Sequence, residues 1–221
     1  MDWTALSVSL RLAALTSLLL LPVGVWVGRW LAFRRVRGRP VIEALLALPL
    51  VLPPTVLGYY LLVAFGGGSR LGQAWKAVFG HPLAFSFEGL LLASLIANLP
   101  FAIQPMQRGF EAVPTDIREA AAVSGFPPWR VLRAIDLPLA WPGIVTGMVL
   151  TFAHTVGEFG VVLMVGGSIP GETRTVAIAL YDRVQAFDMR AAGVMAAFLL
   201  LLSLAALAMT YTLSTRIGRR A

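Results

Sequence analysis

The chain has 221 residues, of which 58% are hydrophobic and 13% are charged, and its formal net charge is +7. A soluble domain carries roughly a quarter charged residues, so this composition predicts an integral membrane protein and argues against a soluble one. The basic residues stand in short clusters beside apolar runs, which argues against nucleic-acid binding, and the absence of cysteine excludes disulfides, thiolate metal sites and cysteine nucleophiles.

The first apolar run covers about residues 7–33 and is predicted to be an uncleaved membrane-spanning helix. No basic region precedes it and no small-residue cleavage site is evident, which disfavours a signal peptide. Arg11 and Arg29 lie near the two ends of this run, where their long side chains can reach the membrane surface. Four arginines follow at once, between residues 34 and 40.

The second apolar run, about residues 41–65, has Pro53-Pro54-Thr55 at its centre. Two prolines remove backbone donors and break a helix, and broken backbone is tolerated in a membrane where it is buried in protein or lines a cavity. A structural kink and a gate or pathway element are both open interpretations. The glycine-rich GGGSRLG at 66–72 lacks the Lys-Ser/Thr ending of a phosphate loop, so we do not expect this chain to hydrolyse ATP.

A third run spans about residues 87–107, and the polar segment 108–138 that follows has the signals of a short structured element. Asp116 is expected to cap a helix, with Glu119 bonding back in a capping box. Three alanines continue that helix, and Ser124-Gly125 is expected to end it because glycine accepts a left-handed conformation cheaply.

After this corner, Pro127 and Pro128 prevent the first helix from continuing. Pro128 suits the first position of a second short helix, expected from Trp129 to Ile135. Pro138 is expected to mark the beginning of the fourth membrane span.

The fourth apolar run, about residues 139–165, contains the polar residues Thr151, His154, Thr155 and Glu158. An intramembrane carboxylate is costly and usually faces the interior of the helix bundle. Glu158 is expected to be structural or to fix a gate, by hydrogen bonding or by pairing with Arg174 or Arg183. His154 is more often a packing residue than a ligand. The pathway candidates are therefore Pro53, Pro54, Thr55, Thr151, His154, Thr155 and Glu158.

A fifth run covers about residues 189–213, and the sequence predicts one membrane domain over residues 1–221 with about five transmembrane helices. Eleven lysines and arginines fall in the segments 34–40 and 108–138 and in the C-terminal tail, against five on the opposite side. The positive-inside rule therefore predicts an outer N-terminus and a cytoplasmic C-terminus, with segment 108–138 in the cytoplasm.

The segment 108–138 resembles the coupling loop of ABC-importer permeases, whose pattern is Glu-Ala-Ala, three residues, Gly, nine residues and Ile-x-Leu-Pro. Here the pattern is met by Glu119-Ala120-Ala121, Gly125 and Ile135-Asp136-Leu137-Pro138. The resemblance implies an all-α type I importer permease whose loop fits a groove on a cytoplasmic ATPase. Its expected coupling residues are Asp116, Arg118, Glu119, Ala120, Ala121, Ser124, Gly125, Phe126, Trp129, Ile135, Leu137 and Pro138.

Three further stretches resemble the molybdate/tungstate ABC-transporter permeases, namely LPLVLPPTVLGYYLLV at 48–63, GEFG at 157–160 and IPGETRT at 169–175. Sulfate/thiosulfate permeases are close cousins with related versions of the first two. The resemblance implies an inner-membrane homodimer that works with an ABC ATPase dimer and an extracytoplasmic molybdate-binding protein. No catalytic residue, metal or cofactor is expected in this chain, since ATP and Mg belong to the partner ATPase.

Two other classes of function are open. A proton-driven secondary transporter would use Glu158 or His154 as a relay, and its uptake would survive loss of an ATPase. A structural membrane assembly factor would use its arginine-rich loops only to anchor to lipid. The pattern in the coupling loop argues against both.

Overall fold

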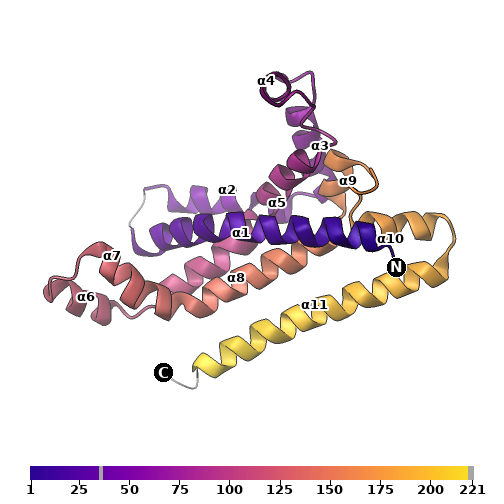
Figure 1. Cartoon of the computed structure of the whole chain (residues 1–221). Coiled ribbons are helices and arrows are strands. Elements are labelled where there is room, and N and C mark those ends of the chain that lie inside the picture. The colour runs from indigo at the N-terminus through magenta and orange to yellow at the C-terminus, as the bar shows by residue number, and fades with distance from the viewer. Residues whose placement is uncertain (35–36, 219–221) are drawn as a thin grey trace.

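The computed structural model describes residues 1–34 and 37–218, with side chains up to residue 212, and it confirms the predicted all-α fold. Helices α1 (Trp3–Phe33), α5 (Phe87–Glu111) and α8 (Leu137–Gly157) pack against one another, and α11 (Met189–Gly218) lies along α8 (Figure 1). The N-terminus and the end of α11 lie at opposite ends of these long helices, as predicted. Arg35, Arg219 and Arg220, which count toward the predicted orientation, lie outside the described residues.

The second apolar run forms two helices, α2 (Arg39–Val51) and α3 (Pro54–Phe65), which are bent by 104° at the predicted proline break. Within the described part of the chain, four helices are long and apolar enough to cross a membrane, and the bent pair raises the number to five if it is one span. Figure 1 shows α3 and α4 (Arg70–Phe79) projecting away from the long helices.

The fourth span differs from the prediction at both ends. At its beginning, α7 (Pro128–Val131) and a π-helical turn, η1 (Leu132–Asp136), run directly into α8, so the helix is continuous over Pro128–Gly157. The helix therefore does not begin at Pro138. The π turn ends with the N–H of Leu137 bonded to the carbonyl of Leu132, and this wider turn lets the helix continue past a proline that cannot donate.

At its other end, the fourth span stops at Gly157 instead of continuing to residue 165. Glu158 has an extended backbone, and a separate short helix, α9 (Gly160–Gly166), packs against α3. The polar segments 69–86 and 166–188 contain two further helices, α4 and α10 (Val176–Gln185). Each of these helices begins with a side-chain cap. The hydroxyl of Ser69 accepts from the N–H of Gly72, and the hydroxyl of Thr175 accepts from the N–H of Ile178.

The bundle is held together by small residues where its helices cross. A Cβ added at Gly143 of α8 would lie 2.7 Å from the Cα of Gly109 in α5, and one added at Gly28 of α1 would lie 2.9 Å from the amide nitrogen of Gln107. Helices in lipid associate through such close backbone packing, since the lipid itself provides no hydrophobic driving force between them. Glycine at these crossings therefore sets the spacing of the three central helices.

We expect Gly143→Ala to destabilise the bundle, because the new methyl group would force α5 and α8 apart. Overpacking of this kind costs about 1–3 kcal/mol. Gly193→Ala in α11 is the matched control, because nothing lies within 4 Å of a Cβ there and alanine is the better helix former. Thermal unfolding in detergent should show a lower midpoint for Gly143→Ala only, and equal midpoints would contradict this account of the crossing.

Candidate functional site

The helix α6 (Thr115–Val123) ends at the predicted corner. Gly125 has φ of 71°, its N–H donates to the carbonyl of Ala122 at 3.0 Å, and the N–H of Phe126 donates to the carbonyl of Ala121 at 3.0 Å. These two bonds form a Schellman motif, which satisfies the last carbonyls of the helix and requires a left-handed residue at the glycine. The chain then reverses through Pro127 into α7, which begins at Pro128 as predicted.

The predicted capping box at the start of α6 is absent. Pro114 occupies the N-cap position, and no side-chain hydrogen bond caps the helix there. Because the helix begins two residues earlier than expected, Asp116 lies inside the first turn and Glu119 is too far along to bond back. Asp116 still lies near the positive end of the helix dipole, which favours a carboxylate at that position.

The two sides of α6 differ sharply in exposure. Ala121 is only 7% exposed and faces the bundle, so it is not free to contact a partner as the sequence suggested, whereas Val123 is 91% exposed. We call the free side of the helix the outward face of α6; its residues are Asp116, Glu119, Ala120 and Val123. Ser124 and Gly125 at the corner and Phe126 and Trp129 beyond it are also exposed. The segment thus presents a small-featured, partly apolar surface away from the bundle.

The inner side of this segment carries a buried ion-pair cluster that the sequence did not predict. Asp136, in the π turn, is 0% exposed. Its Oδ2 accepts from the Nε of Arg29 at 2.8 Å and lies 2.7 Å from an Arg29 Nη. The Nε of Arg118 lies 3.0 Å from Oδ1, an ion pair without hydrogen-bond geometry. We call Arg29, Arg118 and Asp136 the Asp136 cluster.

The Asp136 cluster joins three elements that are distant in sequence. Arg29 comes from the end of α1 and Arg118 from α6, while Asp136 lies in the helix that continues to Gly157. The guanidinium of Arg118 also lies 3.5 Å from the centre of the Phe33 ring. Arg29 was expected to reach toward the membrane surface, but it is held by this buried carboxylate. The Asp136 cluster therefore connects α6 to both α1 and α8.

The predicted pathway residues gather where the α2–α3 bend meets the end of α8. Pro54 and Thr55 line a cavity of about 460 Å³ together with His154, Gly157 and Glu158. Pro53 caps α3 and is exposed beside this cavity. The chain thus has one helix break before Pro54, where α3 begins, and another at Glu158, just before α9. The two breaks lie on the same cavity, and α3 and α9 pack against each other.

Within this junction, His154 and Glu158 belong to a small polar cluster. The Nδ1 of His154 lies 3.0 Å from the amide oxygen of Asn98 and 3.5 Å from Oε2 of Glu158, and its ring stacks on Phe101. Oε1 of Glu158 accepts from the N–H of Val161 at 3.4 Å. Glu158 therefore joins the end of α8 to the beginning of α9.

Of the two alternatives for Glu158, the structure shows hydrogen bonding and not an ion pair with Arg174 or Arg183. Arg174 lies 3.5 Å from Asp182, and Arg183 lies 3.4 Å from Asp188. Thr151 and Thr155 are buried at the helix interface and do not line the cavity. The hydroxyl of Thr155 donates to the carbonyl of Thr151 at 2.7 Å, which satisfies it within α8 itself.

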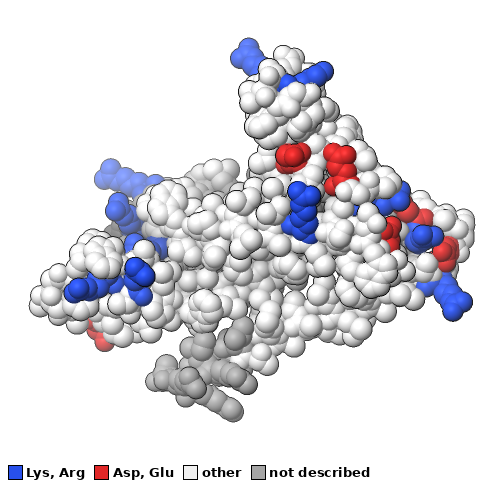
Figure 2. Space-filling model, viewed as in Figure 1, with Lys and Arg blue, Asp and Glu red and all other residues white. Residues whose placement is uncertain are grey.

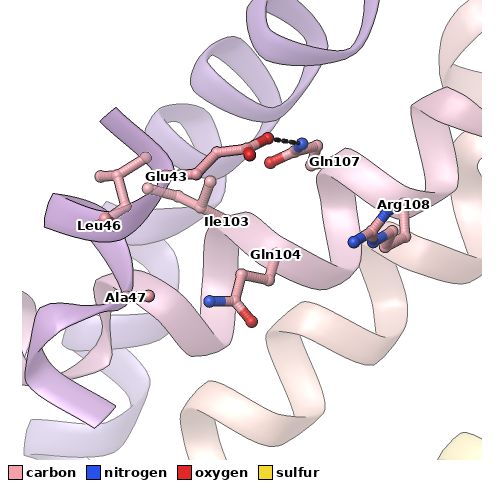
Figure 3. A pocket seen from close by; sticks show the side chains of 8 residues that line it. Glu43, Leu46, Ala47, Ile103, Gln104, Gln107 and Arg108 are labelled. Atoms are coloured by element: carbon pink, nitrogen blue, oxygen red, sulfur yellow. Dashed lines mark hydrogen bonds between the residues drawn. The ribbon is translucent and has the colours of Figure 1, made fainter. Parts of the chain in front are cut away.

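A second pocket, of about 320 Å³, lies between α2 and α5. Figure 3 shows Glu43 of α2 and Gln107 of α5 pointing toward each other, and the Gln107 amide donates to the carboxylate at 2.7 Å. Arg39 binds both Glu43 and Glu111, and Arg108 binds Glu111 at 2.9 Å. Two acids are matched by two bases, so this network joins α2 to α5 without a net charge.

Sequence reasoning missed Asn98, Asp136, Glu43 and Gln107. Each is a polar residue within or beside an apolar run, and such residues usually face protein because lipid cannot satisfy them. That signal was available for Asn98 and Asp136. Their partners were not predictable, since Arg29 and Asp136 are 107 residues apart.

The chain matches a known protein family, described as "Binding-protein-dependent transport system inner membrane component", over residues 21–219. It is 46% identical over 211 residues to the molybdenum transport system permease protein ModB of Azotobacter vinelandii, covering 96% of this chain and 93% of that one. It is 32% identical over 192 residues to the sulfate transport system permease protein CysT of Escherichia coli, covering 86% and 69%.

Solved structures show the same fold. A bacterial alginate ABC transporter in complex with a pentasaccharide-bound periplasmic protein has a chain that superposes with a TM-score of 0.73. The superposition covers 97% of this chain and 78% of that chain, at 16% sequence identity. At this identity the likeness concerns the arrangement of helices alone.

Proposed function

The chain belongs to the family of binding-protein-dependent transport system inner membrane components, and we propose that it is the permease subunit of an ATP-driven importer of molybdate. Membership makes it a multi-pass inner membrane protein. The main support for molybdate as the substrate is the 46% identity to a molybdenum permease, over nearly the whole of both chains. The IPGETRT loop at 169–175 supports the same substrate.

We propose that the outward face of α6 docks on an ABC ATPase, with ATP and Mg held by that partner. The support is the exposed face, the rigid corner at Gly125 and the match to the coupling-loop pattern. The chain has one such loop, whereas an ATPase sandwich has two subunits, so the working permease would be a homodimer. Exposed apolar residues on the α2–α3 bend, such as Val51 and Tyr60, suit a face between two copies.

In this scheme, closure of the ATPase pulls α6, and the Asp136 cluster passes the movement to the helix Pro128–Gly157. A helix of 30 residues extends about 45 Å, at 1.5 Å per residue. Its far end meets Glu158 and the α2–α3 bend, which would open and close the pathway. A molybdate-loaded binding protein would deliver the oxyanion from the outer side. No residue of this chain needs to be catalytic.

Uptake of labelled molybdate by vesicles that contain the permease with its ATPase and binding protein tests the substrate. We expect ATP-dependent uptake that excess unlabelled molybdate suppresses and equal sulfate does not. Tungstate is the third competitor, because it is the tetrahedral oxyanion most like molybdate. Its effect on uptake measures how well the transporter distinguishes the two oxyanions. Stronger competition by sulfate would overturn the proposal in favour of a sulfate importer, the class of the relative at 32% identity.

The variant Glu158→Gln separates an ATP-driven permease from a proton-driven transporter. The amide oxygen of glutamine can still accept from the N–H of Val161, so the junction of α8 and α9 should persist. We expect uptake by this variant to remain ATP-dependent, because no proton passes through residue 158. Uptake that continues without the ATPase in the parent and stops in Glu158→Gln would instead identify a proton relay.

A further inference from the structure

A cavity of about 640 Å³ lies beside the Asp136 cluster, between the end of α1 and the segment α6–α7. Its basic lining residues are Arg29, Arg34 and Arg118, and its apolar lining includes Trp26, Trp30 and Leu132. The proposed function does not use this cavity. The outward face of α6 points away from it, and the pathway residues lie at the other end of α8.

The charges around this cavity favour an anion. Three guanidinium groups face one carboxylate, that of Asp136, which leaves a net charge of +2. A guanidinium has five N–H donors, of which Arg29 uses its Nε and one Nη on Asp136. Arg34 is exposed, and within residues 1–34 and 37–218 it forms no ion pair. Asp136 therefore orients two arginines while several of their donors stay free.

The position of the cavity favours a lipid over a soluble anion. Trp26 is 72% exposed on α1, within one turn of Arg29, and tryptophan concentrates where a membrane meets water. The α1 side of the cavity is mixed, with Val25 and Trp30 apolar and Arg29 and Arg34 nearer the helix end. Figure 2 shows Lys and Arg gathered at the end that carries α6 and α7. Little Asp or Glu is visible at that end, and most of the Asp and Glu in this view lies elsewhere.

We propose that this cavity binds the phosphate of an anionic phospholipid head group, with the acyl chains lying along α1. Arginine forms bidentate bonds to phosphate oxygens, and basic pockets between helices on the cytoplasmic side suit such head groups. A bound phosphate would contact Arg34 of α1 and Arg118 of α6 together. The lipid therefore bridges the first membrane span and the coupling helix.

Quenching of tryptophan fluorescence tests the site in the detergent-purified permease–ATPase complex. The probes are phosphatidylglycerol and phosphatidylcholine with brominated acyl chains, which quench nearby tryptophans such as Trp26 and Trp30. We expect the anionic lipid to quench more strongly. Arg34→Gln should weaken its binding about tenfold, the effect of losing one charge-assisted hydrogen bond. Arg37→Gln is the matched control, because Arg37 is exposed nearby and does not line the cavity.

Four results would overturn the proposal. Equal quenching by the two lipids, or equal affinity in both arginine variants, would show that no head-group site exists there. Displacement of the brominated lipid by millimolar inorganic phosphate would identify a site for free phosphate instead. Quenching that occurs in the permease alone and is lost on assembly with the ATPase would show that a protein surface fills the cavity in the transporter. None of these results depends on which oxyanion is transported.

Discussion

Replacing Asp136 with asparagine is expected to uncouple ATP hydrolysis from uptake. The carboxylate is fully buried and holds Arg29 and Arg118 from two other elements. Removing one partner of a fully buried ion pair costs about 3–5 kcal/mol, and the cost here is smaller because the side chains of Arg29 and Arg118 are 30% and 27% exposed. α6 would still present its outward face to the ATPase, yet its movement would no longer reach α8. Uptake should fall about tenfold or more, within the usual range of a coupling free energy, while the assembled complex still hydrolyses ATP.

The control for this variant is Arg133→Gln. Arg133 lies in the same π turn but is exposed, and it forms no ion pair among the residues that the structure describes. It should leave both uptake and ATP hydrolysis unchanged. A double-mutant cycle of Asp136→Asn with Arg118→Gln adds a test of mechanism, since members of one cluster should not have additive effects. Additive losses, or a normal ratio of uptake to hydrolysis in Asp136→Asn, would refute transmission through the cluster.

Local signals made the corner of the coupling segment predictable. Gly125 is left-handed because glycine, which has no Cβ, adopts a positive φ at little cost, and Pro128 begins a helix because its ring fixes φ near the helical value. The same reasoning failed at the start of α6. Asp116 is a good capping residue, but Pro114 allows the helix to begin earlier, and Asp116 then lies in its first turn.

Tertiary packing decided the features that the sequence did not reveal. The proline break at residues 53–54 was predicted, but its bend of 104° depends on α3 packing against α9. The end of α8 at Gly157 was missed, since apolar residues resume after Glu158 and continue to residue 165. The short helix α9 can pack there because Gly160 lies close against Pro54. A Cβ added at Gly160 would lie only 2.6 Å from the Cβ of Pro54. Periodicity within one run cannot report such a contact.

The candidate pathway residues also divide into two groups, those that line the cavity and those that lie at a helix interface. Pro54, Thr55, His154 and Glu158 were chosen from two separate runs and do line one cavity, because intramembrane polar groups and broken backbone both avoid lipid. Thr151 and Thr155 were chosen with them but lie at a packed helix interface, where threonine can bond to its own helix. Polarity alone therefore predicts that a residue avoids lipid, and it does not separate a pathway from a helix contact.

Replacing Val123 with aspartate is expected to abolish assembly with the ATPase while leaving the permease folded. Val123 is 91% exposed in the last turn of α6, on its outward face, so the side chain contributes little to the fold, and surface changes usually alter stability by at most about 0.5 kcal/mol. In an interface, the same change buries a charge without a partner and adds a third acid beside Asp116 and Glu119. Loss of a central contact of this kind costs about 2 kcal/mol or more, or roughly thirtyfold in affinity.

The matched control is Val78→Asp, because Val78 is 75% exposed in the last turn of α4 as Val123 is in the last turn of α6. Both substitutions place a carboxylate at the unfavourable end of a helix dipole, so this shared cost cancels in the comparison. Co-purification of a tagged ATPase should fail with Val123→Asp and succeed with Val78→Asp, with equal amounts of permease in the membrane. If both variants retain the ATPase equally, the outward face of α6 is not the docking surface, whereas loss of the ATPase from both would show that exposed carboxylates impair assembly non-specifically.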